Sequence, residues 1–127
     1  MAQFLSEEHM AIGTTGLNDD AGFTAAMTNV DLGLQFSVTD APTGEIDYYL
    51  TVGDGAAVMA LGTLEDADAS VSSDYETAAA IAKGELNVQM AFMTGKIKVG
   101  GNMAKVMMYQ GLINEFARVS STLDLDY

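Results

Sequence analysis

The stretch KGELNVQMAFMTGKIKVGGNMAKVM, residues 83–107, decides the fold because it passes through several structural elements in direct succession. Gly84 is typical of the C-terminal cap of a helix, and Asn102 is typical of an N-terminal cap. Phe92 lies in a short helical piece between these two positions. Residues 96–99 alternate between polar and apolar side chains, which predicts a strand. The stretch therefore predicts a helix end, a short helix, a strand and a further helix.

The same stretch resembles the signature of the sterol carrier protein-2 domain, which runs roughly Gly-Lys-Leu-Asn-Pro-Gln-x-Ala-Phe-Met-x-Gly-Lys-Leu-Lys-Ile-x-Gly-Asp-Met. The sequence departs from this pattern at Glu85, Val88, Met90 and Thr94, and these departures bear on ligand choice more than on fold. The matching residues are Gly84, Leu86, Asn87, Gln89, Ala91, Phe92, Met93, Gly95, Lys96, Lys98, Gly101 and Met103.

The resemblance covers nearly all of the chain, because the preceding residues also fit the family's order of a helical start, a strand meander and a helix. It implies a monomeric α+β module that holds lipid in an apolar tunnel between the sheet and the helices. It also implies that the protein is a carrier and not a catalyst.

Alternation of apolar and polar side chains predicts most of the sheet without the resemblance. Turn signals at 40–44 and at Asp54-Gly55 join the first strands as antiparallel hairpins. Ser6 and Asp20 are expected to cap the first two helices, and Ser73 with Glu76 to form a capping box for the third. The predicted strands are 30–38, 46–52, 56–64, 66–72 and 96–99, and the predicted helices are 7–15, 21–28, 74–83, a short piece around 92–93 and one that starts after Asn102.

These elements predict one α+β domain over residues 1–127, with a five-stranded, mainly antiparallel sheet covered by helices on one face. The expected order is α-α-β-β-β-β-α-α-β-α, as in sterol carrier protein-2 domains. Residues 1–10 lack the basic and apolar order of a secretory signal, and no apolar run approaches the ~18 residues of a membrane span. The last residues do not form a peroxisomal Ser-Lys-Leu address. We therefore expect a cytoplasmic protein.

The charge balance limits the range of partners. The chain has 18 acidic and 5 basic residues and a net charge of −13, which argues against nucleic acid because phosphate binding depends on Lys and Arg. The positive charge is concentrated in residues 83–105, which hold four lysines and one glutamate. Lys96 and Lys98 share one strand face, where they either solvate the strand or make a transient contact with anionic lipid headgroups.

Residues with catalytic or metal-binding chemistry occur in no matching pattern. His9 is the only histidine, and we expect it to face solvent from the first helix. Acids between 66 and 74 are spaced like a calcium loop, but Val71 stands where that loop requires glycine. The absence of cysteine excludes disulfides and thiol catalysis. We expect no catalytic residue, no metal site and no cofactor.

Methionine is abundant, with nine residues in the chain. Unbranched thioether side chains adapt to irregular apolar ligands, although they also fill ordinary cores. The final helix, read as continuous, has apolar stripes on two opposite sides. One side faces the sheet, and the other requires a ligand, a lipid surface or a partner subunit. The candidate ligand-binding residues are Phe36, Leu50, Met59, Leu61, Met90, Phe92, Met93, Met103, Met107 and Gln110.

The sequence thus favours a carrier, as a monomer or weak dimer, that binds a fatty-acyl, sterol-like or isoprenoid chain in an apolar tunnel and transfers it. One alternative is a small isomerase or cyclase that uses a carboxylate such as Asp47, which the alternation places on the wet face. Another alternative is an interaction module that docks an apolar helix face on a protein partner.

Overall fold

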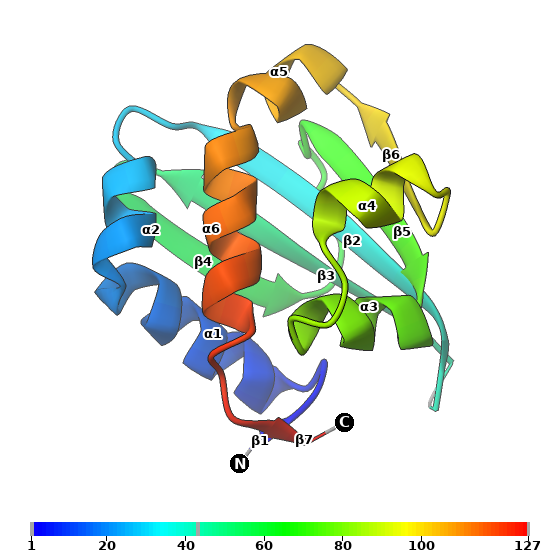
Figure 1. Cartoon of the computed structure of the whole chain (residues 1–127). Helices are drawn as coiled ribbons and strands as arrows, with labels where there is room; N and C mark the ends of the chain where they lie inside the picture. The colour runs from blue at the N-terminus through cyan, green and yellow to red at the C-terminus, as the bar shows by residue number, and fades with distance from the viewer. Residues whose placement is uncertain (1, 43, 127) are drawn as a thin grey trace.

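The computed structural model describes residues 2–42 and 44–126, and it has two layers (Figure 1). One layer is a five-stranded sheet, and helices lie on one of its faces. The strand order is β4-β3-β2-β5-β6, in which only the pairing of β2 with β5 is parallel. The mainly antiparallel α+β fold is confirmed. Its strands are β2 (Leu32–Ala41), β3 (Gly44–Gly53), β4 (Ala56–Leu61), β5 (Ala69–Asp74) and β6 (Ile97–Gly101).

The predicted alternation decides which sheet face meets the helices. Leu34 of β2 pairs with Leu50 of β3, and Leu32 pairs with Val52. All four side chains are buried in the core. The neighbouring hairpin between β3 and β4 turns at Asp54 and Gly55, which have φ values of +53° and +74° and fit the predicted type I′ turn. In the preceding hairpin, residue 43 lies outside the described residues.

The helices confirm two of the predicted caps and correct the third. The Ser6 hydroxyl accepts the N–H of His9 at 3.1 Å, and an Asp20 carboxylate oxygen accepts the N–H of Phe23 at 2.8 Å. The third helix is capped by Asp74 rather than Ser73, because strand β5 extends to Asp74, whose carboxylate accepts the N–H of Thr77 at 2.7 Å. The helices are α1 (Glu7–Asp19), α2 (Ala21–Ala26), α3 (Tyr75–Ala82), α4 (Val88–Met93), α5 (Met103–Met108) and α6 (Gln110–Ser120).

The prediction of one continuous final helix is wrong. Tyr109, with φ −104° and ψ 25°, leaves the helical conformation and separates α5 from α6. The prediction also missed a parallel pair of two-residue strands, β1 (Ala2–Gln3) and β7 (Leu125–Asp126), which joins the two ends of the described chain (Figure 1). Among the described residues, none of the helices has the length and apolar character needed to cross a membrane.

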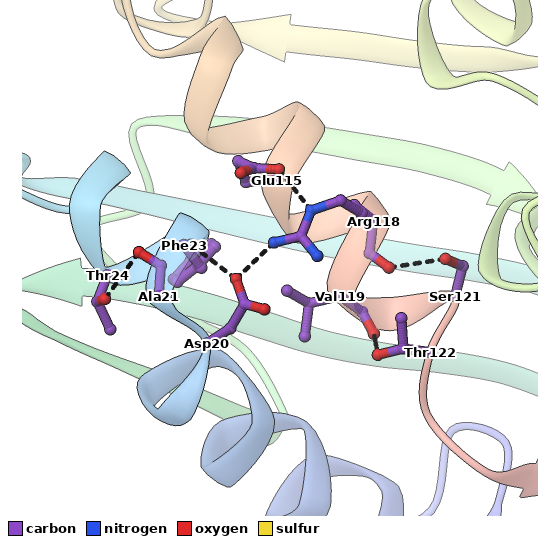
Figure 2. A network of polar contacts seen from close by, with 9 residues as sticks. All are labelled: Asp20, Ala21, Phe23, Thr24, Glu115, Arg118, Val119, Ser121 and Thr122. Atoms are coloured by element: carbon purple, nitrogen blue, oxygen red, sulfur yellow. Dashed lines mark hydrogen bonds and ion pairs between the residues drawn. The ribbon is translucent and has the colours of Figure 1, made fainter.

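A polar network fixes the corner between α1 and α2 against α6 (Figure 2). The guanidinium of Arg118 donates to the Asp20 carboxylate and, at 2.7 Å, to Glu115. The Phe23 N–H and the Arg118 guanidinium lower the pKa of Asp20 below its ordinary value. These side chains are partly exposed, so the network orients the helices and adds little to the free energy of unfolding.

Candidate ligand-binding cavity

A cavity of about 390 Å³ lies between the helical layer and the covered face of the sheet. Its walls come from β2–β6, from α3 to α6 and from the start of the chain. Most of the side chains that line it are apolar. None of its described lining residues is Asp, Glu, Lys or Arg. The cavity therefore suits an apolar ligand and provides no charged partner for an ionic group.

Aromatic side chains form part of the cavity floor. Phe36 of β2 stacks on Tyr48 of β3, with ring centroids 4.7 Å apart and planes 6° from parallel. Phe116 of α6 approaches the Phe36 ring at 5.8 Å. The two strand residues face each other in the β2–β3 register, so the antiparallel pairing itself places the rings together. This stack joins the sheet to α6 beneath the cavity.

The mouth of the cavity is formed by α4 and α5. Its four apolar side chains are Phe92, Met93, Met103 and Met107, and their exposed fractions are 48%, 81%, 37% and 71%. The strand between these helices ends at Gly101, whose φ of +94° lets the chain turn sharply into α5. Large apolar side chains are thus exposed at the open side of the cavity.

The structure brings most of the predicted site residues to the cavity. Three of them lie elsewhere. Leu50 is fully packed in the core, while Leu61 at the end of β4 and Met90 on the outer side of α4 are 36% and 54% exposed. The predicted residues that line the cavity are Phe36, Met59, Phe92, Met93, Met103, Met107 and Gln110.

Gln110 and its neighbour Asn114 are exposed at the rim of the cavity, not enclosed within it. Both amides therefore reach water, whereas the sequence pattern places them within an apolar stripe of the final helix, together with Met103, Met107 and Ile113. The sequence also predicts a second apolar stripe of Met108, Tyr109, Leu112 and Phe116, and this stripe divides at the break in the helix. Leu112 is buried, whereas Met108 is 70% exposed.

His9 is a cavity residue that the sequence analysis placed wrongly. Its ring is 3% exposed, because residues 2–5 fold over the start of α1. Nδ1 accepts the N–H of Leu5 at 2.9 Å, and Leu5 has a left-handed φ of +64°. Burial lowers the pKa of His9 to about 4, so the ring is neutral near pH 7 and carries its proton on Nε2. No sequence pattern around His9 predicts its burial, which becomes apparent only from its hydrogen bond with the Leu5 N–H.

The acidic and basic candidates lie away from the cavity. The strand alternation puts Asp47 on the sheet face opposite to Tyr48. Lys98 lies in the edge strand β6 and Lys96 directly precedes it; both are exposed, and they flank Ile97, which lines the cavity. Both lysines therefore point to the side of the sheet that the helices leave open. The described residues include no cluster of His, Asp and Glu that could hold a metal ion.

A sheet and a helical layer that enclose a mainly apolar cavity, whose described lining lacks Asp, Glu, Lys and Arg, define the class of α+β domain to which this chain belongs. The model of the SCP-2 sterol transfer family matches residues 18–114, and the chain belongs to this family.

Two curated relatives are similar over part of their length. Sterol carrier protein 2 of Gallus gallus is 32% identical over 78 residues, which make up 61% of this chain and 14% of that protein. Sterol carrier protein 2 of Bos taurus gives the same identity and coverage. The chain thus spans a small part of the relatives that it matches.

Solved structures show the same fold. A crystal structure of sterol carrier protein 2 has a TM-score of 0.83 at 21% identity, and the likeness covers 96% of this chain and 100% of that one. A solution structure of a palmitated SCP2 protein from Aedes aegypti has a TM-score of 0.61 at 17% identity, over 90% of this chain and 95% of that one.

Proposed function

We propose that this chain is a cytoplasmic, non-enzymatic carrier that binds one apolar lipid in the cavity and transfers it between membranes or to enzymes. The observation that carries this proposal is the uncharged, mainly apolar cavity of about 390 Å³ with an open mouth. This volume falls in the range of ~300–1,000 Å³ typical of small-molecule sites. Family membership and the palmitate in the name of a structural neighbour support a lipid as the ligand.

The ligand class is a fatty-acyl, sterol-like or isoprenoid chain. Burial of apolar surface contributes ~25 cal/mol per Å², so enclosing a long chain offsets the costs of association and ordering. Flexible methionines at the mouth let the opening adapt as the ligand enters. The carrier acts as a monomer or a weak dimer.

A catalytic role is less well supported. An isomerase or cyclase needs a side chain that can exchange a proton with the substrate. The described cavity residues include no carboxylate, and Asp47 faces the opposite side of the sheet. The exposed apolar side chains of α4 and α5 also suit a protein-docking surface, and that alternative is an outcome of the experiment.

Native mass spectrometry of the purified protein tests the proposal, with solvent extraction of any bound molecule and displacement of fluorescent acyl and sterol probes. We expect one apolar lipid per chain and saturable displacement. A chain that carries no lipid and binds no probe contradicts the carrier function and favours the interaction module.

Transfer requires contact with a membrane, for which Lys96 and Lys98 are the candidates. These lysines are exposed, residues 86–114 contain no acid in a chain with a net charge of −13, and the described acid that interacts with Lys96 is Asp74 of β5. Each lysine near an anionic surface contributes ~1 kcal/mol, an attraction that salt screens within a Debye length. The double variant Lys96→Glu and Lys98→Glu should slow transfer to anionic vesicles at low salt, with unchanged probe affinity in solution. Equal transfer rates for variant and wild type at low salt would assign these lysines to solubility alone.

A further inference from the structure

Two hydrogen-bond donors face the cavity without a protein partner in the part of the chain that the structure describes. Nδ1 of His9 is occupied by the Leu5 N–H, which leaves the proton on Nε2 as a donor. Neither Nε2 of His9 nor the hydroxyl of Tyr48 has a hydrogen-bond partner among residues 2–42 and 44–126. Both residues line the cavity. Neither atom is among the fully enclosed polar atoms of the described residues, so both donors open onto the cavity, where a ligand oxygen can accept from them.

Helix α1 packs along the edge strand β4, and this packing places His9 and Tyr48 at about the same height along the strand direction. Asn18 bonds the backbone of Ala57, and Thr14 bonds the backbone of Met59, so α1 runs antiparallel to β4. The next step of four residues back along α1 reaches Met10, which adjoins His9, and the matching step along β4 reaches residue 61, whose β3 partner is Tyr48. The donors therefore lie on the α1 side of the cavity, and α5 lies at the other end of the helical layer from α1 (Figure 1).

Both donors are uncharged, and the described lining of the cavity holds no charged side chain that could pair with an ionic group of a ligand. Burial lowers the pKa of His9 to about 4 and raises the pKa of Tyr48 above its ordinary value. Since no Lys or Arg is among the described residues that line the cavity, a carboxylate or phosphate there would lose its hydration without gaining a counter-ion.

We propose that the cavity selects a lipid whose polar end is an uncharged oxygen, such as a hydroxyl or carbonyl, which accepts from His9 Nε2–H and bonds the Tyr48 hydroxyl. The polar end lies innermost, and the apolar chain extends to the methionines of the mouth. This assignment of the ligand class rests on the proposed carrier function.

Competition by three molecules of equal chain length tests the preference: hexadecane, hexadecan-1-ol and hexadecanoate at neutral pH, each displacing a fluorescent acyl probe. A hydrogen bond is worth ~1 kcal/mol net, so hexadecan-1-ol should bind about five- to tenfold more tightly than either of the others. Tyr48→Phe should remove most of this advantage. Tyr49→Phe is the matched control, since it makes the same change one residue later on the opposite sheet face, and it should leave all three affinities unchanged.

The sole histidine gives a second measurement in the unaltered protein. The Nε2 nitrogen and proton signals of His9 are unambiguous in nitrogen-15 NMR, and they should move when hexadecan-1-ol binds but not when hexadecane binds. Tighter binding of hexadecanoate than of hexadecan-1-ol overturns the inference. An unmoved His9 signal together with a Tyr48→Phe variant that binds like wild type also overturns it. Failure of all three molecules to bind overturns the carrier function itself.

Discussion

His9 links the conformation of the N-terminal turn to the interior of the cavity. Its Nδ1 holds the N–H of Leu5, whose left-handed φ is unfavourable for a branched side chain without such a partner. Its ring packs against Phe4 at a centroid distance of 5.4 Å. A protonated imidazole would lose the acceptor at Nδ1 and bring a charge into an apolar site. Neutral His9 therefore stabilises the N-terminal turn and also keeps the lining of the cavity uncharged.

The free energy of unfolding should fall on acidification because of His9. Its pKa is about 4 in the folded chain against 6.5 as the ordinary value, so the unfolded state takes up the proton first as the pH falls. The contribution is complete above pH ~6.5 and is lost towards pH ~4, a change of about 3 kcal/mol. Chemical denaturation across this range, compared with His9→Gln, isolates the effect from that of the carboxylates. Identical pH slopes for the two proteins would contradict it.

Phe92 is exposed enough that its removal should affect binding more than stability. The ring is 48% exposed at the mouth, so Phe92→Ala should cost less than the ~3–5 kcal/mol of a buried phenylalanine. The affinity for an acyl probe should fall several-fold. Met90→Ala is the control, because Met90 lies on the same helix outside the cavity. A stability loss in the buried range, or equal effects on affinity in both variants, would contradict this view of the mouth.

Helix starts could be predicted from the sequence, because they depend on interactions within a few residues. Ser6, Asp20 and Asn102 could be assigned as caps because a short polar side chain satisfies the free N–H groups of the next turn. The break at Tyr109 could not be predicted, because nothing in residues 103–120 forbids a continuous helix. Packing of α6 on α1 and α2 sets its direction, while α5 lies beyond the start of α6, at the end of the helical layer away from α1 (Figure 1). The sequence analysis missed the two terminal strands because each has only two residues, too few to show the alternation of apolar and polar side chains that predicts a strand.

The turn from β6 into α5 should tolerate no side chain at Gly101. Its φ is +94°, and an added Cβ would lie 2.7 Å from the Asp68 carbonyl oxygen and 2.8 Å from the Cα of Ala69. We expect Gly101→Ala to lower the free energy of unfolding by more than about 2 kcal/mol.

Gly111 provides the matched control for this substitution. It lies in helix α6, and no atom lies within 4 Å of an added Cβ, so Gly111→Ala should raise stability by about 0.5–1 kcal/mol. Thermal or urea denaturation measures both variants. Similar effects of the two substitutions would show that the close approach at Gly101 does not constrain the turn.

The whole molecule determines the cavity, since its walls come from segments far apart in the chain. Alternation correctly assigned Phe36 and Met59 to the covered face of the sheet. It also included Leu50, because a period of two identifies a face and cannot tell whether helices leave space above it. The strand order, with its one parallel pair, likewise depends on long-range contacts that no local pattern encodes. The expectation of a tunnel came from the resemblance to a family, because the residue pattern alone was equally compatible with a lipid surface or a partner subunit over the final helix.

Entry of a lipid into this cavity is tested most directly by the NMR signals of the methionine methyl groups. Met59 is 5% exposed and lines the cavity, so only a ligand inside the molecule can reach it. Met108 is 70% exposed and lies outside the cavity, so it reports adsorption to the surface. Titration of the unaltered protein with a spin-labelled acyl chain should broaden the signals of Met59, Met93 and Met107 in a saturable manner and leave Met108 sharp. Broadening of Met108 with an unchanged Met59 signal would contradict binding in the cavity.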